Sequence, residues 1–182
     1  MLQEVENQYR KLVKVKAIKE KAIVQCHLKW AKATNDLSLS KGLLRISTDS
    51  AIKDSLGYPN ETTFFDWVIV SSYYSIFHAT QALLGIKGIK IENRLHIATL
   101  IAFANHYIIN QELAEELFLL YEDAESKATE LLEIFEEEKE KRGLFQYHRL
   151  SRNNREPAQE SVKNAELFLE AVQEILYKKN II

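Results

Sequence analysis

Apolar side chains are most concentrated between residues 63 and 86, where they fall on every side of a helix with a 3.6-residue period. A helix that is apolar all round is buried in its protein. We therefore expect this helix to be central, with the other helices packed against it. Thr63 is placed to cap its first turn, and Gly85 and Gly88 are placed to end it.

Amphipathic periodicity predicts further helices on both sides of the central one. The predicted elements are one long charged helix over residues 2–33, a break at Asn35 and Asp36, a helix over 38–55, a connection over 57–60, a helix over 94–108 capped by Asn93, a helix over 111–141 closed by Gly143, and a last helix with Pro157 in its first turn. The last helix has an apolar seam made by Ala158, Val162, Ala165, Leu169, Val172 and Ile175.

The composition favours an all-α fold. The 182 residues include only 5 Gly and 2 Pro, and alternating β-branched runs closed by tight turns are almost absent. We predict an up-and-down bundle of about five or six helices. Residues 1–182 should form a single domain, with residues 1–35 as a basic helical extension at its N-terminus.

Several classes of protein are disfavoured. The single cysteine, Cys26, cannot form an internal disulfide, and the cysteine spacings of zinc sites are missing, so neither a metal nor a cofactor is expected. Asp66, His78 and Gln81 make the central helix a poor membrane span. The N-terminus opens on a charged amphipathic run instead of a signal peptide, which leaves the cytoplasm as the expected location.

Charge is distributed very unevenly although the net charge is only -2. Residues 1–35 carry eight Lys and Arg against three acids, and residues 112–140 carry twelve acids against two lysines. The N-terminal lysines fit a solvated helix face, or a face that binds nucleic-acid phosphates. Basic residues then follow from 141 onward with no acid before Glu156. This last switch makes the segment around residues 141–155 the best candidate for a site.

His148 lies in this acid-free segment, where aromatic residues alternate with arginines. An arginine can bind two oxygens of one phosphate, and a histidine can take a proton from a 2′-hydroxyl and return one to a leaving oxygen. Phe145 and Tyr147 could stack on bases. A basic loop that merely caps the bundle is the alternative. Of the other histidines, His78 is expected to be buried and bonded to a neighbour, whereas His27, His96 and His106 have no distinguishing pattern.

Residues 73–84 resemble a known pattern, Tyr-Tyr-x-x-Phe-His-Ala-x-x-Ala-Leu-Leu, of the HEPN domain family. The similarity continues through Arg94-Leu95-His96 and the run over residues 164–168, and covers the chain from about residue 38 onward. It is greatest to the small archaeal and bacterial HEPN proteins that are paired with minimal nucleotidyltransferases. The motif residues that we expect to be structural are Tyr73, Tyr74, Phe77, His78 and His96.

The resemblance implies an active site. Many members carry an Arg and a His separated by four to six residues, and Arg142 and His148 match with five between them. This implies a metal-independent endoribonuclease toxin that acts as a homodimer and is countered by a minimal nucleotidyltransferase antitoxin. The residues that would then bind RNA are Phe145, Tyr147, Arg149, Arg152 and Arg155.

Two positions depart from the family's active pattern. Gly143 stands where a polar residue usually follows the Arg, and Leu150 stands where a Tyr often follows the His. The alternative is therefore a catalytically inactive module that binds a nucleotidyltransferase, a nucleotide or RNA. A plain structural bundle is the third hypothesis.

Overall fold

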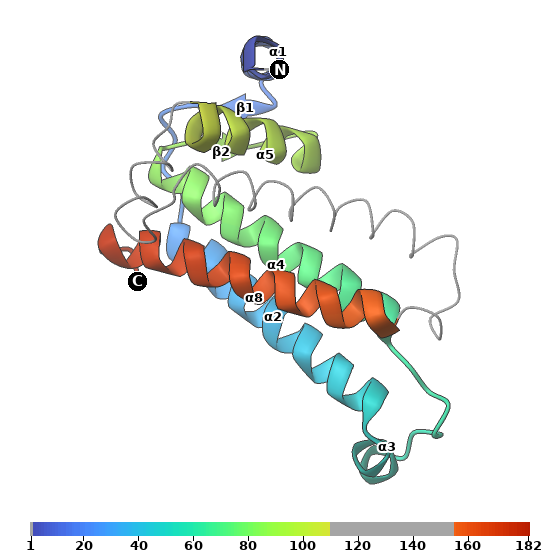
Figure 1. Ribbon diagram of the computed structural model, residues 1–182. Helices are drawn as coiled ribbons and strands as arrows, with labels where there is room; N and C mark the ends of the chain where they lie inside the picture. Colours follow the sequence, from blue (N-terminus) through green and yellow to red (C-terminus); the bar gives the residue numbers. More distant parts are fainter. Residues whose placement is uncertain (1, 110–154) are drawn as a thin grey trace.

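The computed structural model describes residues 2–109 and 155–182, which are almost entirely helical (Figure 1). The elements are α1 (Leu2–Lys14), β1 (Ile18–Lys19), α2 (Cys26–Thr48), α3 (Ser50–Leu56), α4 (Phe65–Ile86), β2 (Lys90–Ile91), α5 (Leu95–Phe103), the π-helical turn η1 (Ala104–Ile109) and α8 (Arg155–Lys178). The predicted all-α class is confirmed. None of the helices in these two ranges combines the length and the apolar character that a membrane span needs.

Helix α4 occupies the centre of the bundle, as its apolar circumference predicts. Seventeen of its 22 residues are buried, and it packs against both α2 and α8 (Figure 1). All six residues of the predicted seam on α8 are buried as well. Three long helices, α2, α4 and α8, therefore form the main layer of the fold.

Buried serines join α2 to α4. The hydroxyl of Ser40 lies 2.6 Å from that of Ser72 and donates to the carbonyl of Val68, while Ser75 donates to the carbonyl of Ala33 at 2.8 Å. Small side chains let two helix backbones approach, and their hydroxyls are satisfied inside the interface. These contacts explain why a helix with several serines is nevertheless a core helix.

A second, smaller group of elements packs at the C-terminal end of α4. Helix α1 lies against α5 and η1, and β1 pairs with β2 in a two-stranded antiparallel ribbon with Ile18 opposite Ile91 (Figure 1). A further backbone hydrogen bond of 2.8 Å runs from Ala22 to the carbonyl of Gly88. The N-terminal segment is thus tied to the chain that follows α4.

The prediction of one helix over residues 2–33 is wrong. Helix α1 ends at Lys14, and Lys16 and Lys21 have left-handed backbone angles, with φ of 59° and 53°, on either side of β1. The expected break at Asn35 and Asp36 is also wrong, because both residues lie inside α2. The real break is at Asp49, whose carboxylate caps α3 by accepting from Ala51 and Ile52.

The predicted helix caps Thr63 and Asn93 are wrong as well. The N-cap of α4 is Phe64, whose backbone N–H donates to the hydroxyl of Ser47 at 2.8 Å, and the N-cap of α5 is Arg94. Gly85 lies inside α4, whereas Gly88 follows the helix with φ of 70°. Pro157 lies in the first turn of α8, as predicted. The helix predicted over 111–141 and Gly143 lie outside the described residues.

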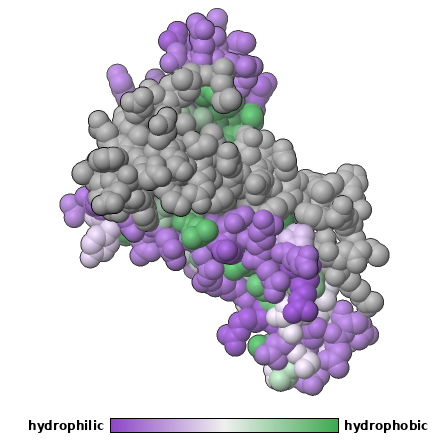
Figure 2. All heavy atoms as spheres, in the orientation of Figure 1, coloured by the Kyte–Doolittle hydropathy of each residue, from purple (hydrophilic) through white to green (hydrophobic). Residues whose placement is uncertain are grey.

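Hydrophilic side chains cover most of the surface that Figure 2 shows around α1 and around α3, at the two ends of the molecule. Most of the buried apolar residues form one cluster built on α4, α5 and α8, and a smaller cluster contains Phe65, Val68, Ile69, Ala158 and Val162. Both clusters include residues of α4, and the smaller one reaches the first turn of α8.

Candidate functional site

The predicted catalytic residues, Arg142 and His148, lie outside the described residues. The same holds for four of the predicted RNA-binding residues, which are Phe145, Tyr147, Arg149 and Arg152. Arg155, the fifth, is the first residue of α8 and is exposed. These assignments stay predictions from the sequence.

The motif residues on α4 converge on a histidine from α5. Tyr73 is fully buried, and its hydroxyl is hydrogen-bonded to Nδ1 of His96. The ring centroid of Phe77 lies 5.0 Å from that of His96. Residues on α4 and α5 that carry the sequence resemblance are therefore in direct contact with each other.

His78 forms a pair with an acid of α2. Its Nδ1 lies 2.7 Å from the carboxylate of Asp36, and the ring of Tyr74 stacks on it with centroids 6.1 Å apart. Burial lowers the pKa of His78, the Asp36 carboxylate opposes that shift, and Lys29 and Lys32 add to it. The expectation that His78 is bonded to a neighbour is confirmed, whereas its side chain is only partly buried. The imidazole of this pair is a group that can accept and release a proton.

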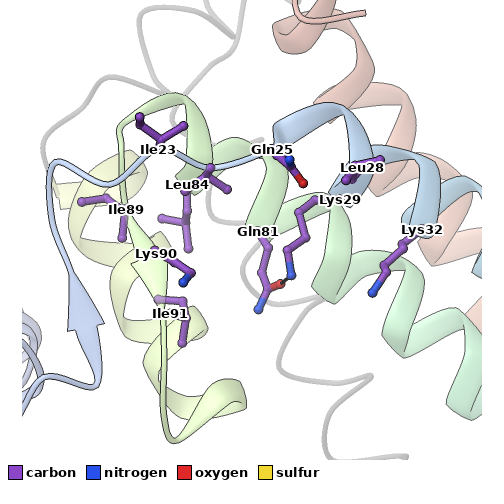
Figure 3. A pocket seen from close by; sticks show the side chains of 11 residues that line it. Ile23, Gln25, Leu28, Lys29, Lys32, Gln81, Leu84, Ile89, Lys90 and Ile91 are labelled. Atoms are coloured by element: carbon purple, nitrogen blue, oxygen red, sulfur yellow. Dashed lines mark hydrogen bonds between the residues drawn. The ribbon is translucent and has the colours of Figure 1, made fainter.

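A pocket of about 410 Å³ lies beside this pair, between the start of α2, helix α4 and β2 (Figure 3). Sequence reasoning did not identify it. Its lining residues are Ile23, Val24, Gln25, Leu28, Lys29, Lys32, Gln81, Leu84, Ile89, Lys90 and Ile91. The lining contains three lysines and no acid.

One of these lysines is held in place. Nζ of Lys29 donates a hydrogen bond of 2.6 Å to the side-chain carbonyl of Gln81, which is buried on α4 (Figure 3). Burial lowers the pKa of Lys29, and the neighbouring charges of Lys32 and Lys90 lower it further. The ammonium groups of Lys32 and Lys90 are therefore close enough to repel that of Lys29.

Further charges lie around the pocket on the ribbon. Lys19 of β1 stands directly opposite Lys90 of β2, and Lys90 makes an ion pair of 2.8 Å with Glu92. That hydrogen bond is the main cause of a lowered pKa for Glu92, whose side chain is exposed. One acid thus meets several lysines, and the local charge stays positive.

One signal in the sequence could have found the pocket. Gln81 is a large polar residue in a helix whose neighbours are almost all apolar, and a buried amide needs a partner. The position of its partner, Lys29, depends on where α2 begins, which local periodicity does not give.

A second histidine network includes Glu20, the residue that directly follows β1. Nε2 of His106 lies 2.8 Å from the hydroxyl of Tyr9, which donates to the carboxylate of Glu20 at 2.9 Å. Burial is the main cause of a raised pKa for Tyr9 and of a lowered pKa for His106. The network ties α1 to η1 and to the segment after β1.

Metal binding has no support in the described ranges, where no three His, Cys, Asp or Glu side chains gather into a possible metal site. Cys26 is a buried free thiol, and burial raises its pKa. Within residues 2–109 and 155–182, the chemistry available is proton transfer at His78 and charge stabilisation by the lysines of the pocket.

A comparison with protein families gives one match. The family model described as HEPN domain matches residues 58–175, which is nearly two-thirds of the chain. No curated protein and no solved structure matches the chain significantly. The matched region contains the Tyr73–His96 contact and both predicted catalytic residues, but it begins after α2 and α3.

Proposed function

The chain belongs to the HEPN domain family, and from that premise we propose that it is a metal-independent endoribonuclease with Arg142 and His148 as its catalytic residues. The observation that carries the proposal is that the family match spans an Arg and a His separated by five residues. This pair lies in a segment without acids between residues 141 and 155, so its nearest neighbours in the sequence carry no charge that would repel a polyanion.

The proposed reaction needs only these two side chains. His148 takes the proton of a ribose 2′-hydroxyl, and the oxygen attacks the adjacent phosphorus. Arg142 stabilises the negative charge that develops on the phosphate oxygens. His148 then returns the proton to the leaving 5′-oxygen, and the products are a 2′,3′-cyclic phosphate and a 5′-hydroxyl. Phe145, Tyr147 and the arginines at 149, 152 and 155 would hold the RNA by stacking and by charge.

The active form that we propose is a homodimer in which two Arg–His pairs face one RNA-binding cleft. We further propose that the protein acts as the toxin of a toxin–antitoxin pair, with a minimal nucleotidyltransferase as its antitoxin. The proposal rests on the resemblance of residues 73–84 to proteins of that kind.

The test is RNA cleavage by the purified full chain in the presence of a metal chelator. His148→Ala and Arg142→Ala should each reduce cleavage by at least about a hundredfold, because each removes a group that acts in the transition state. Matched controls are His27→Ala and Arg45→Ala, two exposed residues of α2 that should leave cleavage unchanged. Cleavage that survives in both catalytic variants, or that requires a metal, would refute the proposal.

A second candidate is favoured by Gly143 and Leu150, which differ from the pattern of active members. In that case the chain is a non-catalytic module that binds a nucleotidyltransferase, a nucleotide or RNA through the same basic segment. Binding of RNA without turnover, lost in Arg142→Ala, would identify this function in place of the first.

A further inference from the structure

The pocket beside α2 is electrostatically unbalanced. The first turn of α2 has no acid, although the N-terminal end of a helix favours negative charge. Lys29 and Lys32 follow that turn instead, and the single acid of α2, Asp36, is bonded to His78. A bound anion would relieve this excess of positive charge.

The ribbon also contributes positive charge, since Glu92, which pairs with Lys90, is the one acid that meets Lys19 and Lys90 there. Like charges directly opposite each other on paired strands are destabilising, yet Lys19 and Lys90 are such a pair. In Figure 3, Lys29 and Lys32 extend from α2 and Lys90 from β2, with Gln81 between them. Lysines from two elements therefore line one open pocket. A protein that tolerates several such local conflicts at one place commonly does so for function.

One of the three lysines, Lys29, is already held in position for binding. The hydrogen bond from Lys29 to Gln81 fixes an ammonium group that would otherwise be free to rotate. Fixing a side chain before the ligand arrives reduces the entropy lost on binding. Lys32 and Lys90 are exposed, so a ligand can reach them from solvent.

The other side of the pocket is apolar. Leu84 and Ile89 are buried at its base, and Ile91 is partly buried next to them; these three form the aliphatic wall. Leu28 is 48% exposed at the rim. A simple inorganic anion would leave this wall in contact with water, whereas an organic anion would cover it.

We propose that this pocket binds a small phosphomonoester with an apolar or aromatic group, the phosphate on the three lysines and the apolar group on the aliphatic wall. A pocket of about 410 Å³ is within the range of small-molecule sites. A strand of RNA would need an extended groove, which a compact pocket does not provide. Lys29 and Lys32 precede the region matched by the family, whereas Gln81, Leu84 and Lys90 lie within it, so the pocket is built from both parts of the chain.

The probe for the test is AMP, with adenosine and inorganic phosphate as its separate halves. Calorimetric titration of the full chain should show that AMP binds more tightly than either half. In Lys29→Gln/Lys32→Gln, the affinity for AMP should fall by roughly tenfold or more, because two charged hydrogen bonds are lost. Lys32→Glu, a single change at an exposed position, should also lower the affinity for AMP and leaves the core unchanged.

The matched control removes the same charge from another helix. Lys11→Gln/Lys14→Gln changes two exposed lysines of α1, neither of which lines the pocket, and should leave the affinity for AMP unchanged. An equal loss in this control would overturn the proposal, since binding would then reflect overall charge.

Two other results would also overturn it. One is no binding of AMP at millimolar concentration, and the other is binding that is unaffected by the pocket variants but lost in His148→Ala. The proposal does not depend on ribonuclease activity: the pocket variants should still cleave RNA if the wild type does, and AMP should still bind if the wild type does not.

Discussion

Gly85 shows how much one missing side chain can matter in this bundle. It lies inside α4, where a Cβ atom would be 2.7 Å from Sγ of Cys26 and 2.8 Å from a methyl carbon of Val24. The absence of a side chain therefore lets the segment before α2 rest directly on α4. Gly42, in the interior of α2, has no atom within 4 Å of the same position. Substitutions at the two glycines therefore separate the effect of a close contact, at Gly85, from the effect of helix propensity, at Gly42.

We predict that Gly85→Ala destabilises the protein by about 1–3 kcal/mol, because a methyl group overpacks the contact with Cys26. Gly42→Ala should instead stabilise it by about 0.5–1 kcal/mol, since alanine favours a helix and meets no neighbour. Urea unfolding of the two variants beside the wild type measures both changes. Equal effects of the same sign would show that the close approach at residue 85 is not what determines stability there.

The partly buried histidines His78 and His106 make stability depend on pH. Burial lowers the pKa of His78 and of His106 below the ordinary 6.5. The unfolded chain therefore binds protons at a higher pH than the folded chain, and stability rises with pH in that window. We predict that the free energy of unfolding is highest above pH 6.5 and falls as the pH drops below it.

Urea unfolding at a series of pH values from about 5 to 8 tests this, because histidines titrate in that range. The double variant His78→Gln/His106→Gln should have a flatter profile. Asp36→Asn should lower the pKa of His78 further, as followed by NMR of its ring protons, because the carboxylate is the group that raises it. A profile that rises towards acid pH would contradict the assignment.

Among the elements, α8 offers the sharpest contrast between a buried and an exposed face. Phe168 is 0% exposed and packs against Phe103 of α5, whereas its neighbour Leu167 is 45% exposed. We predict that Phe168→Ala costs about 3–5 kcal/mol, through lost burial and the cavity left behind. Leu167→Ala should change stability by no more than about 0.5 kcal/mol. Denaturant midpoints of the two variants measure the difference, and comparable losses would mean that α8 is packed on another face.

Periodicity identified the elements that carry their own signal. The apolar circumference of α4 and the seam of α8 made both helices predictable, since each has enough buried positions to define its packing. The N-terminal third was not predictable in this way. Its helix stops at Lys14 because the chain turns to pair Ile18 with Ile91, a contact between residues far apart in sequence. Helical spacing of apolar residues continues through that turn and conceals it.

Contacts between residues far apart in the sequence also limited the prediction of the sites. His78 could be expected to have a partner because a buried imidazole needs one, but nothing local identified Asp36, which the sequence suggested was a helix break. The pocket depends on α2, α4 and β2 meeting, so its lysines looked like an ordinary solvated face. By contrast, the Arg142 and His148 pair could be proposed from the sequence, because the resemblance to the family supplies the pattern and the five intervening residues are a local property.

For the whole molecule, the proposed ribonuclease depends on association of two chains. If the cleft is built from two Arg–His pairs, a separated chain has only half of the residues that hold the RNA. We therefore predict that light scattering finds the mass of two chains under assay conditions. The specific RNase activity should fall on dilution in step with dissociation, because dissociation separates the two halves of the cleft.

The control is the His148→Ala variant, which should dimerise like the wild type while lacking activity, so that assembly and chemistry are measured separately. Pocket variants at Lys29 and Lys32 should also dimerise and cleave normally, since the pocket lies within one chain on α2, α4 and β2. A strictly monomeric protein with full activity would contradict the shared cleft, because the Arg142 and His148 of a single chain would then be enough for cleavage. A dimer with no activity at any concentration would instead favour the non-catalytic module.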